Sequence, residues 1–130
     1  MKKNVNIIIA IAAIIFSVFS LIEGSRVLLG LSVPEYVVFT PLLIYNIIMG
    51  ITGVYVGVQI LQQHINALRN SAVISLFHIS ILITISLLYL FDSVVSIHSV
   101  YAMIFRTVFW LIITTTIWAI NNYIQTKKEK

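Results

Sequence analysis

The chain has 130 residues, of which 60% are hydrophobic and 9% charged, and its mean hydropathy is +1.06. These values exclude an ordinary soluble domain, in which about a quarter of the residues are charged. The net charge of +4 does not indicate nucleic-acid binding, because the lysines gather at the chain ends, and the absence of cysteine excludes disulfides and thiolate metal sites.

Four hydrophobic stretches are each long enough to cross a bilayer, which takes about 20 residues in a helix. We expect helices over residues 5–29, 33–64, 72–91 and 99–122, joined by short connections. The predicted fold is therefore all-α and integral to the membrane. It is a single domain, 1–130, in which the four transmembrane helices form an antiparallel up-down bundle.

The first predicted helix follows Lys2 and Lys3, as a signal-peptide core also would. Its apolar run is longer than the ~7–15 residues of such a core, so we expect it to remain as a membrane helix. Small and polar residues recur on one of its faces at spacings of three and four, which favours close packing against another helix. They are Asn6, Ala10, Ala13, Ser17, Ser20 and Gly24.

The second predicted helix has two marked features. Ser32 to Glu35 has the pattern of a capping box and predicts a helix start near Val33, after a chain reversal at Gly30. Pro41 would then lie inside the helix and kink it. A second small-residue face contains Asn46, Gly50, Gly53 and Gly57. The two faces are predicted to pack together as a hairpin, and the alternatives are a dimer face or the border of a ligand cavity.

Helix 72–91 carries a partly polar line, because Ser75, His78, Tyr89 and Asp92 fall on one face by helical spacing. Such a line is typical either of hydrogen bonds between helices or of a proton relay. We take Asn46, His78 and Tyr89 as candidate functional residues within the membrane. His64 and His78 facing each other can also ligate haem or a metal, although we expect neither cofactor nor metal.

The positive charges predict the orientation in the membrane. With the amino terminus inside, six basic residues are internal, namely Lys2, Lys3, Arg69, Lys127, Lys128 and Lys130. Only Arg26 and Arg106 are then external. By the positive-inside rule, we expect a multi-pass protein of the cell (inner) membrane with both termini in the cytoplasm.

A charged cluster is predicted at the outer ends of the helices. Glu23 and Arg106 lie at matching depth with opposite charges, so we expect them to form an ion pair. Arg26 follows Glu23 by one turn, and Asp92 closes the third helix on the same side. These four residues are the candidate binding cluster.

No arrangement of a nucleophile with a base is apparent in the sequence, so we expect no catalytic residues and a protein that is not an enzyme. The most favoured function is a non-enzymatic component that acts as a homo-oligomer or as a subunit of a larger membrane assembly. Its expected partners are the lipid bilayer and membrane protein subunits, with no nucleic acid. A small-solute or ion transporter or channel and a haem- or metal-binding redox protein are the alternatives.

In its four short spans and its length, the chain resembles the small multidrug resistance transporters. That resemblance implies a four-helix transporter with an acidic residue near the middle of the first helix. In this sequence the acidic residue of the first helix, Glu23, lies near its outer end. The resemblance therefore covers topology only.

Overall fold

The computed structural model describes residues 2–130, and the regular structure in this range is entirely helical. The four helices are α1 (Lys2–Leu28), α2 (Thr40–Leu61), α3 (Ala67–Phe91) and α4 (Ile97–Lys128). Each is long and apolar enough to span a membrane, which confirms the prediction of four helices of that length and hydrophobicity.

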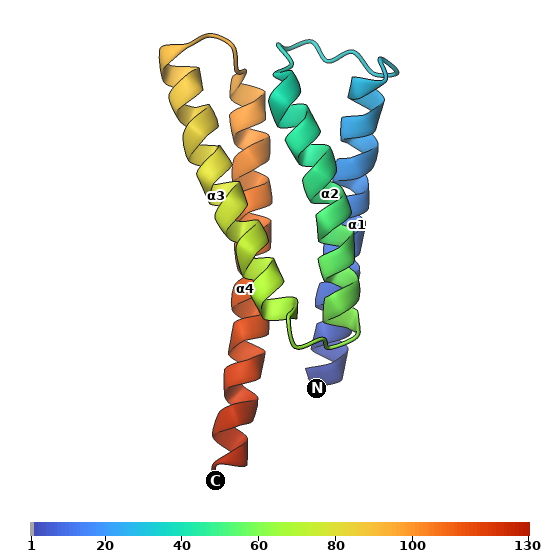
Figure 1. Ribbon diagram of the computed structural model, residues 1–130, viewed down its shortest axis with the longest axis vertical. Coiled ribbons are helices and arrows are strands. Elements are labelled where there is room, and N and C mark those ends of the chain that lie inside the picture. Colours follow the sequence, from blue (N-terminus) through green and yellow to red (C-terminus); the bar gives the residue numbers. More distant parts are fainter. Residues whose placement is uncertain (1) are drawn as a thin grey trace.

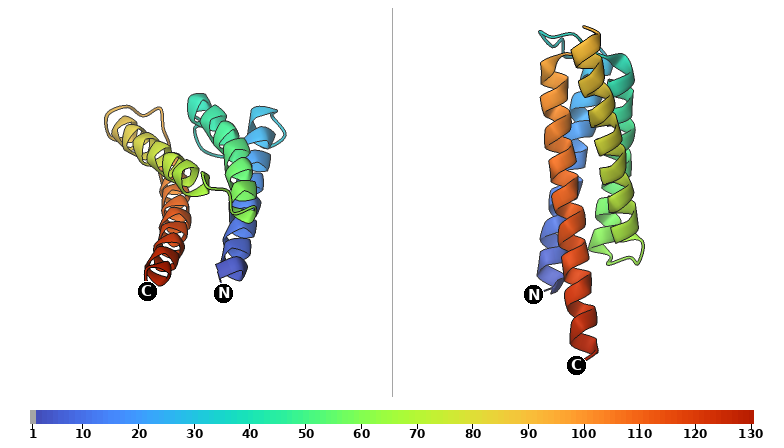
Figure 2. Two further views of the ribbon diagram at one scale, coloured as in Figure 1. Left: turned by 60° about the horizontal axis from the view of Figure 1, so that its bottom comes forward. Right: turned by 90° about the vertical axis from the view of Figure 1, so that its left-hand side faces the viewer.

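The helices are arranged as two hairpins, α1 with α2 and α3 with α4 (Figure 1). The α1–α2 and α3–α4 connections lie at one end of the molecule, which we call the two-loop end. The α2–α3 connection and both chain ends lie toward the opposite end, the terminal end (Figure 1). Helices α2 and α3 approach each other near the connection that joins them and diverge toward the two-loop end, as Figure 2 also shows.

The packing of α1 on α2 confirms the predicted contact between the two small-residue faces. Gly50 lies so close to α1 that an added Cβ would be 3.1 Å from the carbonyl oxygen of Ser17. Gly57 would place a Cβ 3.4 Å from the carbonyl oxygen of Ala10, which is itself fully buried. Glycine therefore brings the two backbones together, and dispersion contacts at this short distance can replace the hydrophobic drive that lipid does not provide.

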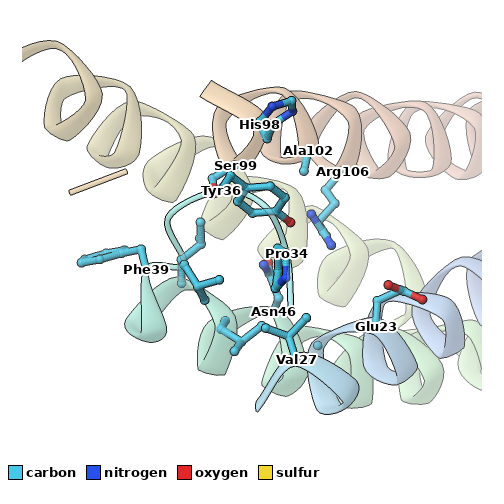
Figure 3. A pocket seen from close by; sticks show the side chains of 14 residues that line it. Glu23, Val27, Pro34, Tyr36, Phe39, Asn46, His98, Ser99, Ala102 and Arg106 are labelled. Carbon is cyan, nitrogen blue, oxygen red and sulfur yellow. The ribbon is translucent and has the colours of Figure 1, made fainter. Parts of the chain in front are cut away.

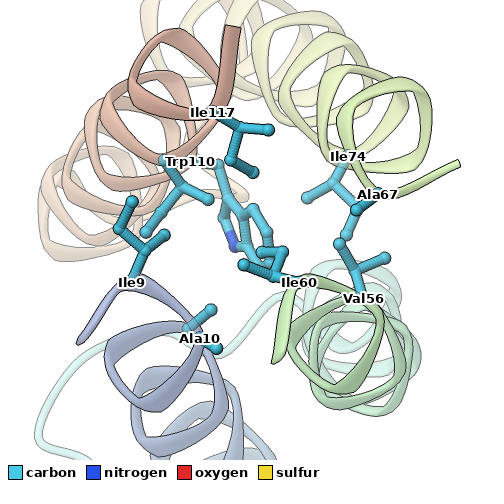
Figure 4. Close-up of a cluster of buried hydrophobic side chains, with 10 residues drawn as sticks. Ile9, Ala10, Val56, Ile60, Ala67, Ile74, Trp110 and Ile117 are labelled. Carbon is cyan, nitrogen blue, oxygen red and sulfur yellow. The ribbon is translucent and has the colours of Figure 1, made fainter. Parts of the chain in front are cut away.

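Two clusters of buried side chains make up the core. The larger one lies toward the terminal end, where Trp110 is surrounded by aliphatic residues from all four helices (Figure 4). The smaller one, toward the two-loop end, contains Leu42, Ile85, Val95, Val100 and Met103. Many large apolar side chains remain exposed around the outside, including Ile8, Ile51, Leu90 and Phe105.

The start of α2 differs from the prediction. Gly30 has a positive φ of 72°, as expected for the residue that ends the first helix, but the chain then continues without helix to Thr40. The predicted capping box at residues 32–35 is therefore wrong. Pro41 lies in the first turn of α2, where no internal hydrogen bond is lost, so the predicted kink is also wrong. Beginning the helix at the proline avoids the clash that an internal proline would cause.

Helices α3 and α4 extend beyond their predicted ranges, whereas α1 and α2 end one and three residues earlier than predicted. Helix α3 begins five residues earlier than predicted, at Ala67, and α4 runs on from the predicted 99–122 to Lys128. Ser96 caps α4, because its hydroxyl oxygen accepts a hydrogen bond from the backbone N–H of Ser99 at 3.2 Å. Hydropathy locates the apolar part of each helix, whereas caps and backbone hydrogen bonds decide where it ends.

Candidate functional site

A cavity of about 120 Å³ lies at the two-loop end, between α1, α2, α4 and the α1–α2 connection. We call it the vestibule. Its polar lining includes Glu23, Tyr36, Asn46, His98 and Arg106 (Figure 3). Two of the four predicted cluster residues, Glu23 and Arg106, therefore line one cavity, whereas Arg26 and Asp92 do not belong to its lining.

Arg106 is the most unusual residue of the vestibule. It lies nine residues after the start of α4 at Ile97, or about 14 Å along the helix axis at 1.5 Å per residue. Its Nε atom is buried and has no hydrogen-bond partner among residues 2–130. In the same range no carboxylate lies within 4.0 Å of its guanidinium group. Buried donors are nearly always paired, so an unpaired guanidinium nitrogen points to a missing partner.

Asn46 presents a second unpaired group to the same cavity from the opposite hairpin. It lies on α2, and its Oδ1 atom is buried without a hydrogen-bond partner among the described residues. Rotation of the amide by half a turn exchanges this oxygen for the NH₂ group, so the side chain can offer either a donor or an acceptor there. Figure 3 shows Asn46, Tyr36 and Arg106 gathered around one space from three segments of the chain.

Beneath the vestibule, a cavity of about 10 Å³ is lined by Asn46, Arg106, His78 and Trp110, among others. His78 is 2% exposed, and its Nδ1 atom is hydrogen-bonded to the Tyr45 hydroxyl group at 2.7 Å. This bond joins α2 to α3. The predicted candidates Asn46 and His78 therefore lie close to Arg106 in the interior, around a space no larger than one water molecule.

Two further polar pairs connect the helices toward the terminal end. Ser75 and Thr114 are hydrogen-bonded at 3.0 Å between α3 and α4, and Asn70 donates to Gln59 at 2.8 Å between α3 and α2. Their geometry agrees with the expectation that polar side chains in these helices bond across to neighbours. Each such bond contributes about 0.6 kcal/mol in membrane proteins.

The predicted polar line on α3 is divided in the structure. Ser75 and His78 are buried, but Tyr89 is 42% exposed and Asp92 is exposed at the helix end. The expectation that His64 and His78 face each other is wrong, because His64 lies in the α2–α3 connection and lines a different cavity near the terminal end. The helix predicted to reach residue 64 ends at Leu61, and this moves His64 out of register with α3.

The predicted ion pair between Glu23 and Arg106 is absent from residues 2–130. Glu23 instead lies 3.7 Å from Arg26 on its own helix, and its side chain is 62% exposed. The physical reason is the weak contact between α1 and α4, which leaves Glu23 free to turn toward the nearest cation one turn away. Glu23 and Arg106 were predicted to pair because they lie at similar depth, but similar depth does not make two side chains point toward each other.

Replacing Glu23 with glutamine is therefore expected to change the free energy of unfolding by less than about 1 kcal/mol, as for other exposed ion pairs. In a double-mutant cycle with Arg106→Gln, the two effects should add to within about 0.5 kcal/mol. Unfolding of the purified variants in detergent measures both values. A coupling well above 1 kcal/mol would show that Glu23 and Arg106 do pair.

Sequence reasoning missed the part that Tyr36 plays in the site. Tyr36 stands in the non-helical α1–α2 connection, lines the vestibule and stacks on His98 with ring centroids 5.2 Å apart. The apolar pattern of the sequence predicts a helix over residues 33–64, which includes Tyr36. Pro34 and Pro41 enclose this segment, and their spacing was the signal for an extended connection.

Comparison of the chain with models of known protein families, with curated proteins and with solved structures found no match. The likeness to small multidrug resistance transporters therefore rests on topology alone. The functional argument has to come from the vestibule itself.

Proposed function

We propose that this chain is a non-enzymatic, multi-pass membrane protein that binds a small anionic group in the vestibule. The observation that carries the proposal is the buried, unpaired Nε of Arg106 at the floor of an open cavity. An arginine without a partner at membrane depth costs about 3 kcal/mol, and a bound anion would offset that cost. Guanidinium groups bind carboxylate and phosphate through paired, charge-assisted hydrogen bonds.

The remaining lining suits the same ligand. The Asn46 amide and the Tyr36 hydroxyl can each donate a hydrogen bond to an oxygen held at Arg106. A volume of about 120 Å³ accommodates a phosphate or carboxylate group together with a few water molecules. The one carboxylate in the lining, Glu23, is exposed and paired with Arg26, which reduces its repulsion of an anion.

The proposal is one of binding rather than conduction. The interior beyond the vestibule is filled by Trp110, which is 2% exposed, and by buried isoleucines such as Ile74 and Ile113. A transporter or channel needs a continuous polar path, and these side chains interrupt it between the vestibule and the terminal end.

Sulfate and inorganic phosphate are suitable probes for testing the proposal. We expect the purified protein to bind one of them saturably, and Arg106→Gln to weaken binding about 10- to 100-fold, as for a lost charge-assisted hydrogen bond. Arg69→Gln is the matched control, because Arg69 is an exposed arginine on α3 outside the vestibule. Isothermal titration calorimetry measures the affinities. Equal affinity in the Arg106 variant and the wild type would refute the proposed function.

We further propose that the four helices form an antiparallel bundle integral to the cell membrane, with both termini in the cytoplasm. Six of the eight basic residues then lie on the cytoplasmic side, and the vestibule opens outward. The many exposed apolar side chains around the helices support immersion in lipid.

This orientation predicts which introduced cysteines react from outside. The sequence has no cysteine, so single substitutions can be read without background. Val33→Cys, at a position that is 86% exposed in the α1–α2 connection, should react in whole cells with a membrane-impermeant maleimide. Ile65→Cys, at a position that is 90% exposed in the α2–α3 connection, should react only after permeabilisation. The reverse pattern would invert the topology.

The chain is also proposed to act as a homo-oligomer or as a subunit of a larger membrane assembly. A mostly apolar groove of about 500 Å³ between α2 and α3, bordered by Tyr55, Val73 and Phe77, supports this proposal because it offers a surface for another helix. Native mass spectrometry from mild detergent distinguishes a homo-oligomer from a mixed assembly.

A further inference from the structure

The contact between α1 and α4 is the weakest among neighbouring helices, and a crevice of about 210 Å³ opens there on the side of the molecule. Its lining consists of Phe16, Phe19, Ser20 and Glu23 from α1, with Ala102, Phe105 and Arg106 from α4. Apart from the Arg106 end, where Glu23 also lies, the lining is almost wholly apolar.

Aromatic rings form the inner part of this crevice. Phe16 of α1 stacks on Phe109 of α4, with ring centroids 4.0 Å apart, and lies 5.7 Å from the ring of Phe105. The rings of Phe19 and Phe105 are 63% and 65% exposed, so the crevice opens on the outer surface of the helices. In a membrane, that opening faces lipid tails.

The crevice and the vestibule adjoin each other at Arg106. Glu23, Ala102 and Arg106 line both spaces, one polar and open at the two-loop end, the other apolar and open to the side. A single ligand can therefore reach the unpaired guanidinium with a charged group and occupy the crevice with a hydrocarbon chain.

We infer that the anionic group bound in the vestibule is the headgroup of a membrane lipid, and that one acyl chain of this lipid lies in the α1–α4 crevice. The inference rests on the proposed anion binding at Arg106 and names the ligand class. The crevice is larger than the ~150 Å³ apolar cavity that suffices to bind benzene. Burial of each additional methylene adds about 0.8 kcal/mol of affinity, so even a few carbons in the crevice would favour a lipid over a soluble anion.

The charges around the junction of the two cavities limit which lipid headgroup can bind. Arg106 and Arg26 supply two positive charges near the junction, and Glu23 supplies one negative charge. His98 lies at the vestibule wall beside Tyr36. A headgroup with one negative charge and a small polar portion, such as phosphatidylglycerol, matches this balance. A zwitterionic choline headgroup would bring a second, bulky cation toward Arg106.

The test compares dioctanoyl phosphatidylglycerol with glycerol phosphate, which has the same phosphate but no chain. For the wild-type protein in detergent, we expect the lipid to bind about 10- to 100-fold more tightly than glycerol phosphate. Dioctanoyl phosphatidylcholine corrects for simple partitioning into the micelle and should bind no better than background. Native mass spectrometry and the ligand-induced rise in melting temperature measure these affinities.

Substitutions in the crevice distinguish the contribution of the acyl chain to binding from that of the headgroup. Phe19→Ala combined with Phe105→Ala should remove most of the advantage of the lipid and leave the affinity for glycerol phosphate unchanged. Both side chains are more than half exposed, so this double variant is expected to fold. Phe91→Ala with Trp118→Ala is the matched control, because these exposed aromatic residues lie on α3 and α4 away from the crevice.

The outcomes distinguish the two proposals. If glycerol phosphate binds and depends on Arg106, but the lipid has no advantage or keeps it in the crevice variant, the lipid inference is wrong and the proposed function stands. If neither ligand depends on Arg106, the proposed function is wrong as well. If the double variant does not fold, the wild-type comparison of the lipid with glycerol phosphate still tests the lipid inference, and Arg106→Gln still tests the proposed function.

Discussion

Replacing Arg106 with glutamine is expected to stabilise the ligand-free protein, even though it should weaken anion binding. Glutamine keeps a polar side chain of moderate length but removes a charge that has no partner in the described structure. The expected gain in the free energy of unfolding is at most about 3 kcal/mol, the cost of placing an unpaired arginine within a membrane. Denaturation by sodium dodecyl sulfate in mixed micelles without added anion measures it.

Two comparisons make this result specific to the charge. Arg106→Lys retains the charge and should leave the stability near that of the wild type. An anion concentration that saturates the wild type should stabilise it by mass action and stabilise Arg106→Gln much less, so that the difference between them shrinks or reverses. A glutamine variant that is less stable than the wild type without ligand would show that Arg106 has a structural partner.

Gly53→Leu is expected to separate α1 from α2 and to lower the stability by about 3 kcal/mol or more. A Cβ atom at this position would already collide with the Ser17 hydroxyl group, and it would lie 2.9 Å from Cζ2 of Trp110. Trp110 is buried and cannot move without disturbing the larger core cluster. The unfolding free energy in detergent and the yield of folded protein measure the effect.

A graded series tests the cause. Gly53→Ala adds only the Cβ atom and should fall between the wild type and Gly53→Leu. Ala119→Leu on the exposed face of α4 is the matched control for added bulk and should be nearly neutral. Wild-type stability in Gly53→Leu would mean that the two helices do not pack through this glycine.

The helix pairing was predictable because it depends on spacing alone. Small residues every three or four positions define a face whatever the rest of the fold, so Gly50, Gly53 and Gly57 identified the contact between α1 and α2. The start of α2 was not predicted, because the apolar pattern continues through residues 36–39 although the backbone there is not helical. Tertiary packing and Pro41 determine that boundary.

Part of the candidate site was predictable from the sequence, but the pairing of its charges was not. Polar residues in apolar helices stand out, and Asn46, His78 and Arg106 indeed lie around two adjoining cavities. The partner of Glu23 depends on how α1 is rotated and on how closely α4 approaches it. The position of a residue along its helix reveals neither the rotation nor the distance. The sequence therefore predicted Arg106 as the partner of Glu23, whereas the structure pairs Glu23 with Arg26.

For the membrane location proposed above, the separation of the chain into two hairpins also bears on how the protein would be inserted during synthesis. The extensive α1–α2 contact involves only the first half of the chain, so this pair can assemble before α4 has been translated. Arg106 would then enter beside a finished pair that already offers a polar surface with Asn46. Arg106, whose charge is costly to place in a membrane, would therefore be inserted only after the α1–α2 pair has formed. Truncated chains that lack α4 should still insert their first hairpin.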